Sequence, residues 1–320
     1  MEQNGAKQPL PSTAADATPT HHAITHSSPA SFTPDEHDIK PITGPRRFCI
    51  EFYAETKKLW YLAGPIIFMA ICQYSLGAVT QLLAGHISTI ALAAVAVQIS
   101  LITGFANGAM AGMGCALETL CGQAFGAGQI NMLGIYMQRS WVILNSTAIL
   151  LMILYIFTAP LLKLIGQKPE IAEAAGTFAI YMIPQLFANA FSFPVAKFLQ
   201  AQSKVMVMAL IAGAVLLFHA LLSWFLMLKL GLGLVGAAIA LNSSSILIAL
   251  CQVGYVLSGT CGGAWSGFSW GAFQNLWSFV KLSMASAVML CLEIWYYTAL
   301  ILFAGYLKNA EIAVDALSIW

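Results

Sequence analysis

Long apolar runs, separated by short polar stretches, dominate the chain from residue 59 onward. A helix needs about 20 mostly apolar residues to cross the roughly 30 Å hydrocarbon core of a bilayer. Six runs before residue 258 reach that length, and a seventh follows them. The pattern therefore predicts an all-α polytopic membrane protein. The first six expected helices are Leu59–Gly85, Ile87–Gly114, Gly134–Leu162, Ala174–Ala196, Val205–Leu228 and Leu230–Leu257.

The seventh apolar run, from Lys281 to Lys308, contains a single charged residue between its two lysines, Glu293. On a helix this acid lies roughly 18 Å and 22 Å from the two lysines, near the middle of a bilayer. A carboxylate at that depth costs about 2.5–3.5 kcal/mol, so it faces protein or water rather than lipid. We favour a residue that holds and releases a proton. The structural alternative is a protonated acid that only donates one hydrogen bond between helices.

Polar segments flank and separate the apolar runs. Residues 1–45 are rich in Pro, Ser and Thr, which predicts a disordered tail. Residues 46–58 mix basic, acidic and aromatic side chains, as a juxtamembrane interfacial segment does. Residues 258–275 are an expected linker, and an eighth helix begins near Ala313. Loops and flanks on the same side of the membrane as the N-terminus carry more Lys and Arg than those on the opposite side. This distribution predicts a cytoplasmic N-terminus.

Composition excludes several classes of function. Only 8% of residues are charged and 59% are hydrophobic, whereas a soluble domain carries about 25% charged residues. The net charge is +1 and no basic patch occurs, so no nucleic-acid partner is expected. The sequence contains no CxxC pair, His/Cys cluster or nucleotide-binding motif, so we expect no metal, no cofactor and no enzyme activity. Energy for any transport would then come from an ion gradient or a partner.

Polar and proline residues inside the expected helices predict a cavity. A single amide side chain in a membrane helix more often forms an interhelical hydrogen bond, worth about 0.6 kcal/mol. Many amide side chains spread over several membrane helices favour a polar pathway instead. Pro184 and Pro194 interrupt one helix, which fits a hinge, a cavity wall or a simple packing kink. His219 alone is too weak a signal to predict a proton relay. The cavity candidates are Gln81, Asn107, Gln185, Asn189, Trp295 and Tyr296.

Several stretches resemble plant members of the multidrug and toxic compound extrusion (MATE) family. They read GMGCALETLCGQAFGAGQ (112–129), IPQLF (183–187), FLQAQS (198–203), ASAVMLCLEIW (285–295) and DALSI (315–319). The resemblance runs from about Glu55 to Ile319 and implies a MATE-type fold, with two six-helix lobes facing a central cavity. On that fold, 59–257 is a complete N-lobe and 258–275 a cytoplasmic inter-lobe linker. Residues 276–320 start the C-lobe with a seventh helix and a stub of the eighth.

The resemblance also implies proton-coupled antiport, in which organic solutes or xenobiotics such as flavonoids or alkaloids leave the cytoplasm as protons return. The partners are then the lipid bilayer, a small organic substrate and protons, and the membrane is vacuolar or plasma. The acid of the CLEIW motif, Glu293, is the residue that the family associates with proton coupling. Prokaryotic relatives carry an aspartate where this chain has Thr80 and Gln81, which argues against a sodium site.

Compared with the family pattern, most of the second lobe lies beyond this chain. The expected explanation is a truncated product or a partial gene model of a transporter. The alternative is a truncated, non-transporting fragment that binds a full-length relative and modulates it. A full-length relative or a separate C-lobe is therefore an expected partner.

Overall fold

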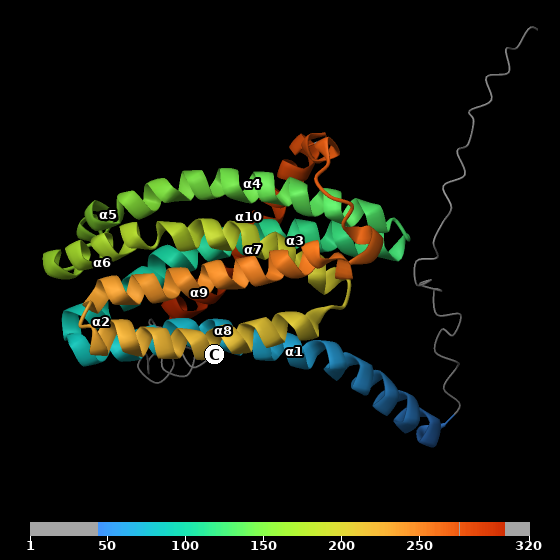
Figure 1. Ribbon diagram of the computed structural model, residues 1–320, viewed down its shortest axis with the longest axis horizontal. Helices are drawn as coiled ribbons and strands as arrows, with labels where there is room; N and C mark the ends of the chain where they lie inside the picture. Colours follow the sequence, from blue (N-terminus) through green and yellow to red (C-terminus); the bar gives the residue numbers. More distant parts are fainter. Residues whose placement is uncertain (1–43, 275, 305–320) are drawn as a thin grey trace, which may run out of the picture. The chain divides into compact units, whose positions relative to one another are not determined.

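The computed structural model describes residues 44–274 and 276–304, which are helical and contain no strand (Figure 1). This confirms the all-α fold predicted from the apolar runs. In chain order the α-helices are α1 (Pro45–Ile87), α2 (Thr89–Val97), α3 (Gly104–Gly126), α4 (Ile130–Ile156), α5 (Thr158–Leu164), α6 (Pro169–Tyr181), α7 (Ile183–Ala201), α8 (Val205–Trp224), α9 (Gly233–Tyr255) and α10 (Leu276–Ala304). Shorter π and 3-10 segments are η1 (Gln98–Thr103), η2 (Phe225–Lys229), η3 (Val256–Thr260), η4 (Gly262–Ala264) and η5 (Trp270–Phe273).

Five helical segments in the described residues are long and apolar enough to cross a membrane. They are α1, α2 through α3, α4, α8 with η2, and α9 with η3. Helices α6 and α7 form a sixth crossing if the pair, bent by 50°, counts as one broken span. These segments overlap the six expected before residue 258. Helix α10 covers residues 281–304 of the expected seventh span, and residues 305–320, with the expected eighth helix, lie outside the described part.

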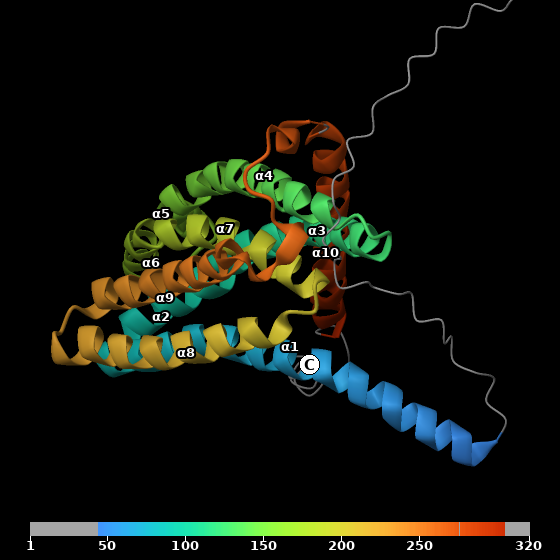
Figure 2. The same cartoon turned by 45° about the vertical axis from the view of Figure 1, so that its right-hand side comes forward.

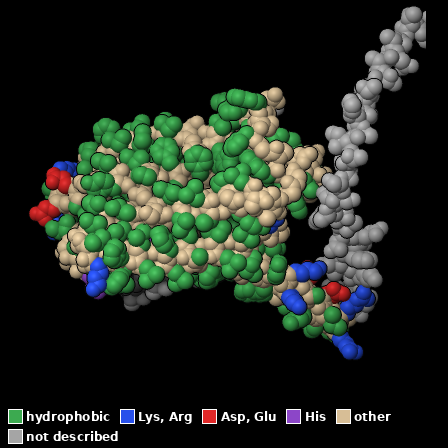
Figure 3. All heavy atoms as spheres, viewed as in Figure 1, with side chains coloured by type: hydrophobic (Ala, Val, Ile, Leu, Met, Phe, Trp, Pro, Cys, Tyr) green, Lys and Arg blue, Asp and Glu red, His purple; other side chains and the backbone are tan. Residues whose placement is uncertain are grey.

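The helices pack around a core of small and sulfur-containing side chains. Helix α1 lies along α8, α8 along α9, and α3 packs against α4, α7 and α10 (Figures 1 and 2). Met110, Met137 and Leu144 are fully buried among these helices. In the face seen in Figure 3, hydrophobic side chains cover the bundle, and charged side chains gather toward its ends. An apolar exterior with charged ends is what a lipid-facing bundle requires.

Two segment boundaries differ from the pattern-based expectation. The first expected helix, Leu59–Gly85, begins earlier in the structure, because α1 runs without a break from Pro45 to Ile87, takes in residues 46–58 and includes Pro65. The third expected helix is divided, since α4 ends at Ile156 and α5 begins at Thr158. Both differences concern where a helix starts or stops, which apolar periodicity defines poorly.

The expected linker packs directly against α4. The Gln138 side chain donates a hydrogen bond from Nε2 to the Gly267 carbonyl at 3.0 Å and accepts one at Oε1 from the Ser269 amide at 2.9 Å. Arg139 donates to the Gly271 carbonyl at 3.1 Å. A glycine allows this approach, because a Cβ at Gly134 would lie 2.6 Å from the Ala264 carbonyl oxygen. The linker is therefore held to α4 by specific polar contacts.

Replacement of Gln138 by leucine is expected to loosen the linker without unfolding the bundle. Two hydrogen bonds of about 1 kcal/mol each would be lost, so amide exchange in residues 262–273 should accelerate by about tenfold or more. Hydrogen–deuterium exchange in lipid nanodiscs measures this directly. Gln123→Leu, on an exposed position of α3, is the matched control and should leave linker exchange unchanged. Equal exchange in both variants would show that the Gln138 contacts do not hold the linker.

Close packing joins α3 and α10. Gly104, Gly108 and Gly112 recur every four residues in α3, the small-residue spacing that lets membrane helices approach. At Gly112 an added Cβ would lie only 2.7 Å from the Cα of Ala287 in α10. Real Cβ atoms do not come that close to backbone, so alanine at this position would push the two helices apart.

Gly112→Ala is therefore expected to lower the midpoint of thermal unfolding, because overpacking costs about 1–3 kcal/mol. Gly122→Ala is expected to raise this midpoint instead. Apart from its chain neighbours and the backbone of its own helix, no atom lies within 4 Å of a Cβ built there, and alanine is the better helix former by about 1 kcal/mol. Thermal unfolding of both variants in one detergent tests the pair. A Gly112→Ala protein as stable as Gly122→Ala would contradict the close α3–α10 contact.

Candidate functional site

A cavity of about 160 Å³, lined by both polar and apolar side chains, lies among α1, the η1–α3 segment, α7 and α9. Three of the residues predicted from sequence, Asn107, Gln185 and Asn189, line it together. These amides come from two expected helices, so the fold brings together side chains that are far apart in sequence. The other lining residues are Gln73, Leu76, Gly77, Ile99, Thr103, Ser192, Phe193, Leu241, Ser245 and Ile248.

One face of α7 provides most of the polar links around this cavity. Gln185, Asn189 and Ser192 follow the i, i+4, i+7 spacing that places side chains on the same side of a helix. Gln185 Nε2 donates to Ser245 Oγ on α9 at 3.0 Å, and Asn189 Nδ2 donates to Asn107 Oδ1 on α3 at 3.1 Å. Ser192 Oγ donates to Gln252 Oε1 on α9 at 3.1 Å. Helix α7 thus connects α3 and α9 through amide and hydroxyl groups.

The two prolines expected at a hinge occupy different environments. Pro184 lies in the first turn of α7, directly after the break at Met182 where α6 and α7 bend by 50°. Proline suits that position because its missing N–H would have no helical partner there. Pro194 is buried inside α7, and the helix continues past it to Ala201. Of these two prolines, Pro184 therefore lies next to the bend.

Gln81 lies in a second, more open cavity of about 630 Å³. Gln73, Gly77 and Gln81 follow each other every four residues and mark one face of α1. Gln73, Gly77 and Ile99 line both cavities, so the two adjoin. Gln81 is therefore a neighbour of the amide cavity rather than part of its lining.

The residues predicted on the seventh helix are placed only by their backbone. Glu293 and Trp295 lie within α10, but their side chains fall outside the described part of the structure. Tyr296 is described and exposed. The interpretation of Glu293 as a proton site therefore stays a prediction from its sequence position, supported by a helical backbone at that point.

The sequence pattern missed the hydroxyl groups that complete the cavity lining. Thr103 Oγ1 accepts from Gln98 Nε2 at 2.9 Å and lies 3.2 Å from the Tyr155 hydroxyl. Gln98 sits at the start of the π-helical segment η1, whose wider turn brings residues five apart together. The i, i+7 spacing could have identified Ser192. Thr103 gave no such signal, because Ser and Thr occur throughout the apolar runs.

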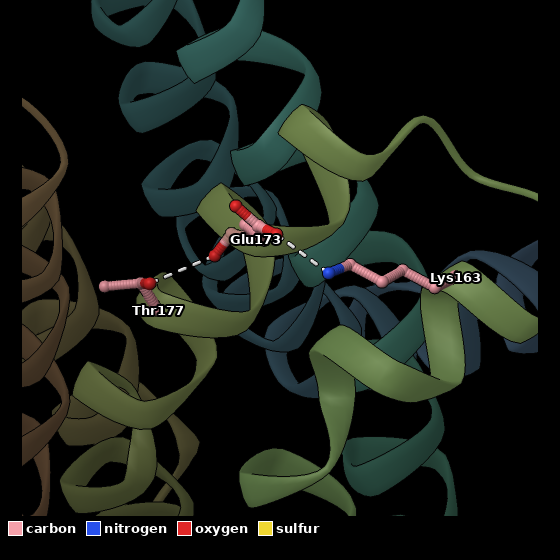
Figure 4. A network of polar contacts seen from close by, with 3 residues as sticks. All are labelled: Lys163, Glu173 and Thr177. Atoms are coloured by element: carbon pink, nitrogen blue, oxygen red, sulfur yellow. Dashed lines mark hydrogen bonds and ion pairs between the residues drawn. The ribbon is translucent and has the colours of Figure 1, made fainter.

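Ion pairs lie away from the cavity, at the bundle ends. Lys197 pairs with Glu118 at 2.6 Å, joining α7 to α3. Lys163 pairs with Glu173 at 2.8 Å, and the Thr177 hydroxyl donates to the Glu173 carbonyl at 3.0 Å (Figure 4). Exposed pairs of this kind contribute at most about 1 kcal/mol. They mark the polar ends of the helices and add little to the stability of the bundle.

The cavity can bind but has no group for acid–base chemistry in its described lining. Amides and hydroxyls donate and accept hydrogen bonds, whereas no carboxylate, imidazole or ammonium group is among the described lining residues. Within the described residues no group of three or more His, Cys, Asp or Glu side chains could hold a metal ion. The amides and hydroxyls of this cavity can form hydrogen bonds with a bound molecule.

Known protein sequences include close relatives of this chain. Residues 65–225, half of the chain, match the MatE family model. Protein DETOXIFICATION 29 of Arabidopsis thaliana is 65% identical over 282 residues, covering 88% of this chain and 56% of that protein. Protein DETOXIFICATION 30 of the same plant is 66% identical over 282 residues, covering 88% and 57%. The chain therefore spans a little over half the length of these relatives.

Solved structures show the same helix arrangement. The crystal structure of the eukaryotic MATE transporter AtDTX14 is 35% identical, with a TM-score of 0.75 over 84% of this chain and 60% of that one. The Vibrio cholerae MATE transporter VcmN, in its bent form, shares the fold at 19% identity, with a TM-score of 0.65 over 82% of this chain and 59% of that one. By its family match, its plant relatives and its fold, the chain belongs to the multidrug and toxic compound extrusion (MATE) family of membrane transporters.

Proposed function

We propose that this chain forms the solute-binding part of a secondary active transporter. It would export organic solutes or xenobiotics from the cytoplasm, outward or into the vacuole, in exchange for protons. The observation that carries the proposal is the amide-lined cavity formed by Asn107, Gln185 and Asn189 inside an apolar helical bundle. Polar groups inside a membrane-spanning bundle are costly unless they are paired or face a water-filled pathway. The N-terminus would lie in the cytoplasm.

The cavity lining suggests an amphipathic substrate, such as a flavonoid or an alkaloid. Leu76, Ile99 and Phe193 supply apolar surface beside the amides, and such mixed lining is typical of small-molecule sites. The amide cavity alone is smaller than the roughly 300–1,000 Å³ of ordinary ligand pockets. The adjoining cavity of about 630 Å³ extends it along α1. A ligand larger than the first cavity would then contact both Gln81 and the amides.

Proton coupling is assigned to Glu293. The lining of the amide cavity offers no titratable acid or base, and the adjoining cavity has Tyr74 and His86 but no carboxylate, so an acid for coupling has to lie elsewhere. Glu293 is the single acid of its apolar run and lies on α10, which packs closely on α3. Helix α3 also carries Asn107, so a shift of α10 on protonation has a direct route to the cavity wall.

The bend beside Pro184 supplies a place for movement. Gln185 and Asn189 lie just beyond it on α7 and hold α9 and α3 through hydrogen bonds. A change in the bend would move these side chains relative to the cavity. Such a change fits alternating access, in which part of the bundle rocks around a fixed site near the membrane midplane.

Transport driven by a pH gradient tests the proposal. Proteoliposomes containing the 320-residue chain should accumulate a fluorescent cationic dye when a gradient is imposed, and empty vesicles should not. A chimera in which the remaining sequence of DETOXIFICATION 29 follows residue 320 is assayed in parallel. Gradient-dependent uptake by either protein supports antiport. Absence of uptake by both proteins would overturn the proposed function.

A further inference from the structure

A buried histidine lies behind the cavity wall and is not part of the cavity lining. His219 is fully buried and belongs to α8, which packs against α1 and α9 (Figures 1 and 2). Its ring makes hydrogen bonds to side chains or backbone of all three helices. The three hydroxyl residues that contact the ring, Thr80, Ser223 and Ser244, are fully buried as well. This cluster is the largest concentration of buried polar contacts around one side chain in the described residues.

The Nδ1 side of the ring faces acceptors. Nδ1 lies 2.9 Å from Ser244 Oγ and 3.4 Å from the Ala240 carbonyl oxygen. Ser244 donates its own hydroxyl proton to that same carbonyl at 2.8 Å, so its oxygen presents a lone pair to the ring. We therefore assign the Nδ1 proton to both states of the ring, with Ser244 Oγ and the Ala240 carbonyl as its acceptors.

The Nε2 side of the ring faces two hydrogen-bond acceptors and one hydroxyl, of Ser223, that can either donate or accept. Nε2 lies 3.1 Å from the Leu76 carbonyl and 3.0 Å from Thr80 Oγ1. Thr80 donates its proton to the Leu76 carbonyl at 2.9 Å, so its oxygen also presents a lone pair. Ser223 Oγ, 3.2 Å away, has no other hydrogen bond among the described residues. Ser223 can donate to a bare Nε2 or accept from an Nε2–H.

We propose that His219 is a second proton-binding site, at which Nε2 takes up a proton from water in the neighbouring amide cavity and later returns it. No other bond changes. In the neutral ring Ser223 donates to Nε2. In the charged ring Nε2–H is donated to Leu76 and Thr80, and the charge is shared among carbonyl and hydroxyl dipoles instead of a carboxylate. Rotation of the Ser223 hydroxyl thus lets it donate to a bare Nε2 or accept from an Nε2–H.

The site lies next to the proposed binding cavity. Leu76, whose carbonyl contacts Nε2, and Gly77 line the cavity, and Ser245 on α9 follows Ser244 in sequence and lines it too. The turn of α1 from Leu76 to Thr80 therefore borders His219 on one side and the cavities on the other. Protonation that shortens the Nε2–Leu76 contact would pull this turn away from a bound solute.

No described charged group neutralises the ring directly. None of the hydrogen bonds or ion pairs of His219 involves a carboxylate, an ammonium or another titratable side chain of the described residues. The elements packed against α8 are α1, α7, α9 and η2. Their titratable and charged residues are Arg46, Arg47, Cys49, Glu51, Tyr53, Glu55, Lys57, Lys58, Tyr61, Cys72, Tyr74, His86, Lys197, Lys229, Cys251 and Tyr255.

The inference deepens the proposed antiport, but it is tested without transport. Nitrogen-15 NMR of the histidine-labelled 320-residue chain in nanodiscs reports the protonation of each ring nitrogen, and His219→Gln and His86→Gln variants assign the signals. We expect Nδ1 of His219 to stay protonated from pH 5 to 8 and Nε2 to titrate within that range. A ring that keeps one neutral tautomer throughout would overturn the proposal, whether or not the chain transports.

Two variants that each lose one hydroxyl are expected to shift the pH midpoint of Nε2 titration in opposite directions. Ser223→Ala removes the donor to the neutral ring, so the Nε2 midpoint should move up by about one pH unit. Ser244→Ala removes an acceptor at Nδ1, so the midpoint should move down by a similar amount. Both variants delete one hydroxyl in the same cluster, so each is the size control for the other. Midpoints that move in the same direction, or not at all, would contradict the assignment.

Discussion

Replacement of Glu293 by glutamine is expected to reduce pH-gradient-driven uptake more than tenfold while leaving the protein folded. Glutamine has the size and hydrogen-bonding reach of a protonated glutamate, but it cannot release a proton. A transporter that depends on this proton would be held in one state and would no longer exchange solute for protons. The measurement is the initial rate of dye uptake into proteoliposomes at a fixed gradient.

Glu55→Gln is the matched control for this result. Glu55 is an exposed acid that pairs with Lys58 at 2.8 Å near the start of α1, far along the helix from the cavity residues. Its loss should leave uptake unchanged. Full uptake by Glu293→Gln would remove Glu293 from the mechanism, even if the chain remains a transporter. Equal losses in both variants would point to charge in general rather than to proton release at one site.

Asn189→Leu is expected to weaken solute binding, with an apparent KM about tenfold higher and a smaller change in maximal rate. The substitution removes the donor to Asn107 Oδ1 and puts an isobutyl group where the cavity presents an amide. Asn107 is then left without that partner, and a solute that hydrogen bonds in the cavity loses one contact. A tenfold change corresponds to about 1.4 kcal/mol, the scale of one such contact.

Asn145→Leu makes the same chemical change at a site outside the cavity. Asn145 bonds within its own helix, donating to the Trp141 carbonyl at 2.8 Å. Its replacement should leave the KM unchanged, and thermal unfolding of both variants shows whether folding is intact. An unaltered KM in Asn189→Leu would show that this cavity is not where solute binds.

Much of the fold could be predicted from the lengths of the apolar runs. Long runs without charge predict membrane helices because an unpaired charge or backbone group is so costly in hydrocarbon. Asn107, Gln185 and Asn189, chosen as cavity candidates from the sequence, line one cavity in the structure, and their role in binding a solute stays a prediction. That agreement has a simple cause, since polar side chains in membrane helices turn inward whichever neighbours they meet.

Other features depend on which helices become neighbours, which composition does not determine. His219 was a single residue in an apolar run, and its cluster exists because α1 places Leu76 and Thr80 opposite it. The attachment of the linker to α4 depends on Gln138 meeting two backbone groups about 130 residues away. Gln81 was grouped with the amides, but it faces the adjoining cavity because it lies two turns beyond Gln73 on α1.

Proton coupling is tested most directly by the reverse flux. Proteoliposomes containing the chain or its DETOXIFICATION 29 chimera are loaded with a pH-sensitive dye, and an organic cation is added outside with no initial pH gradient. Antiport predicts that inward solute movement drives protons out, so the internal pH rises. The change should be absent in empty vesicles and in Glu293→Gln. Solute entry with no change of internal pH would contradict proton coupling.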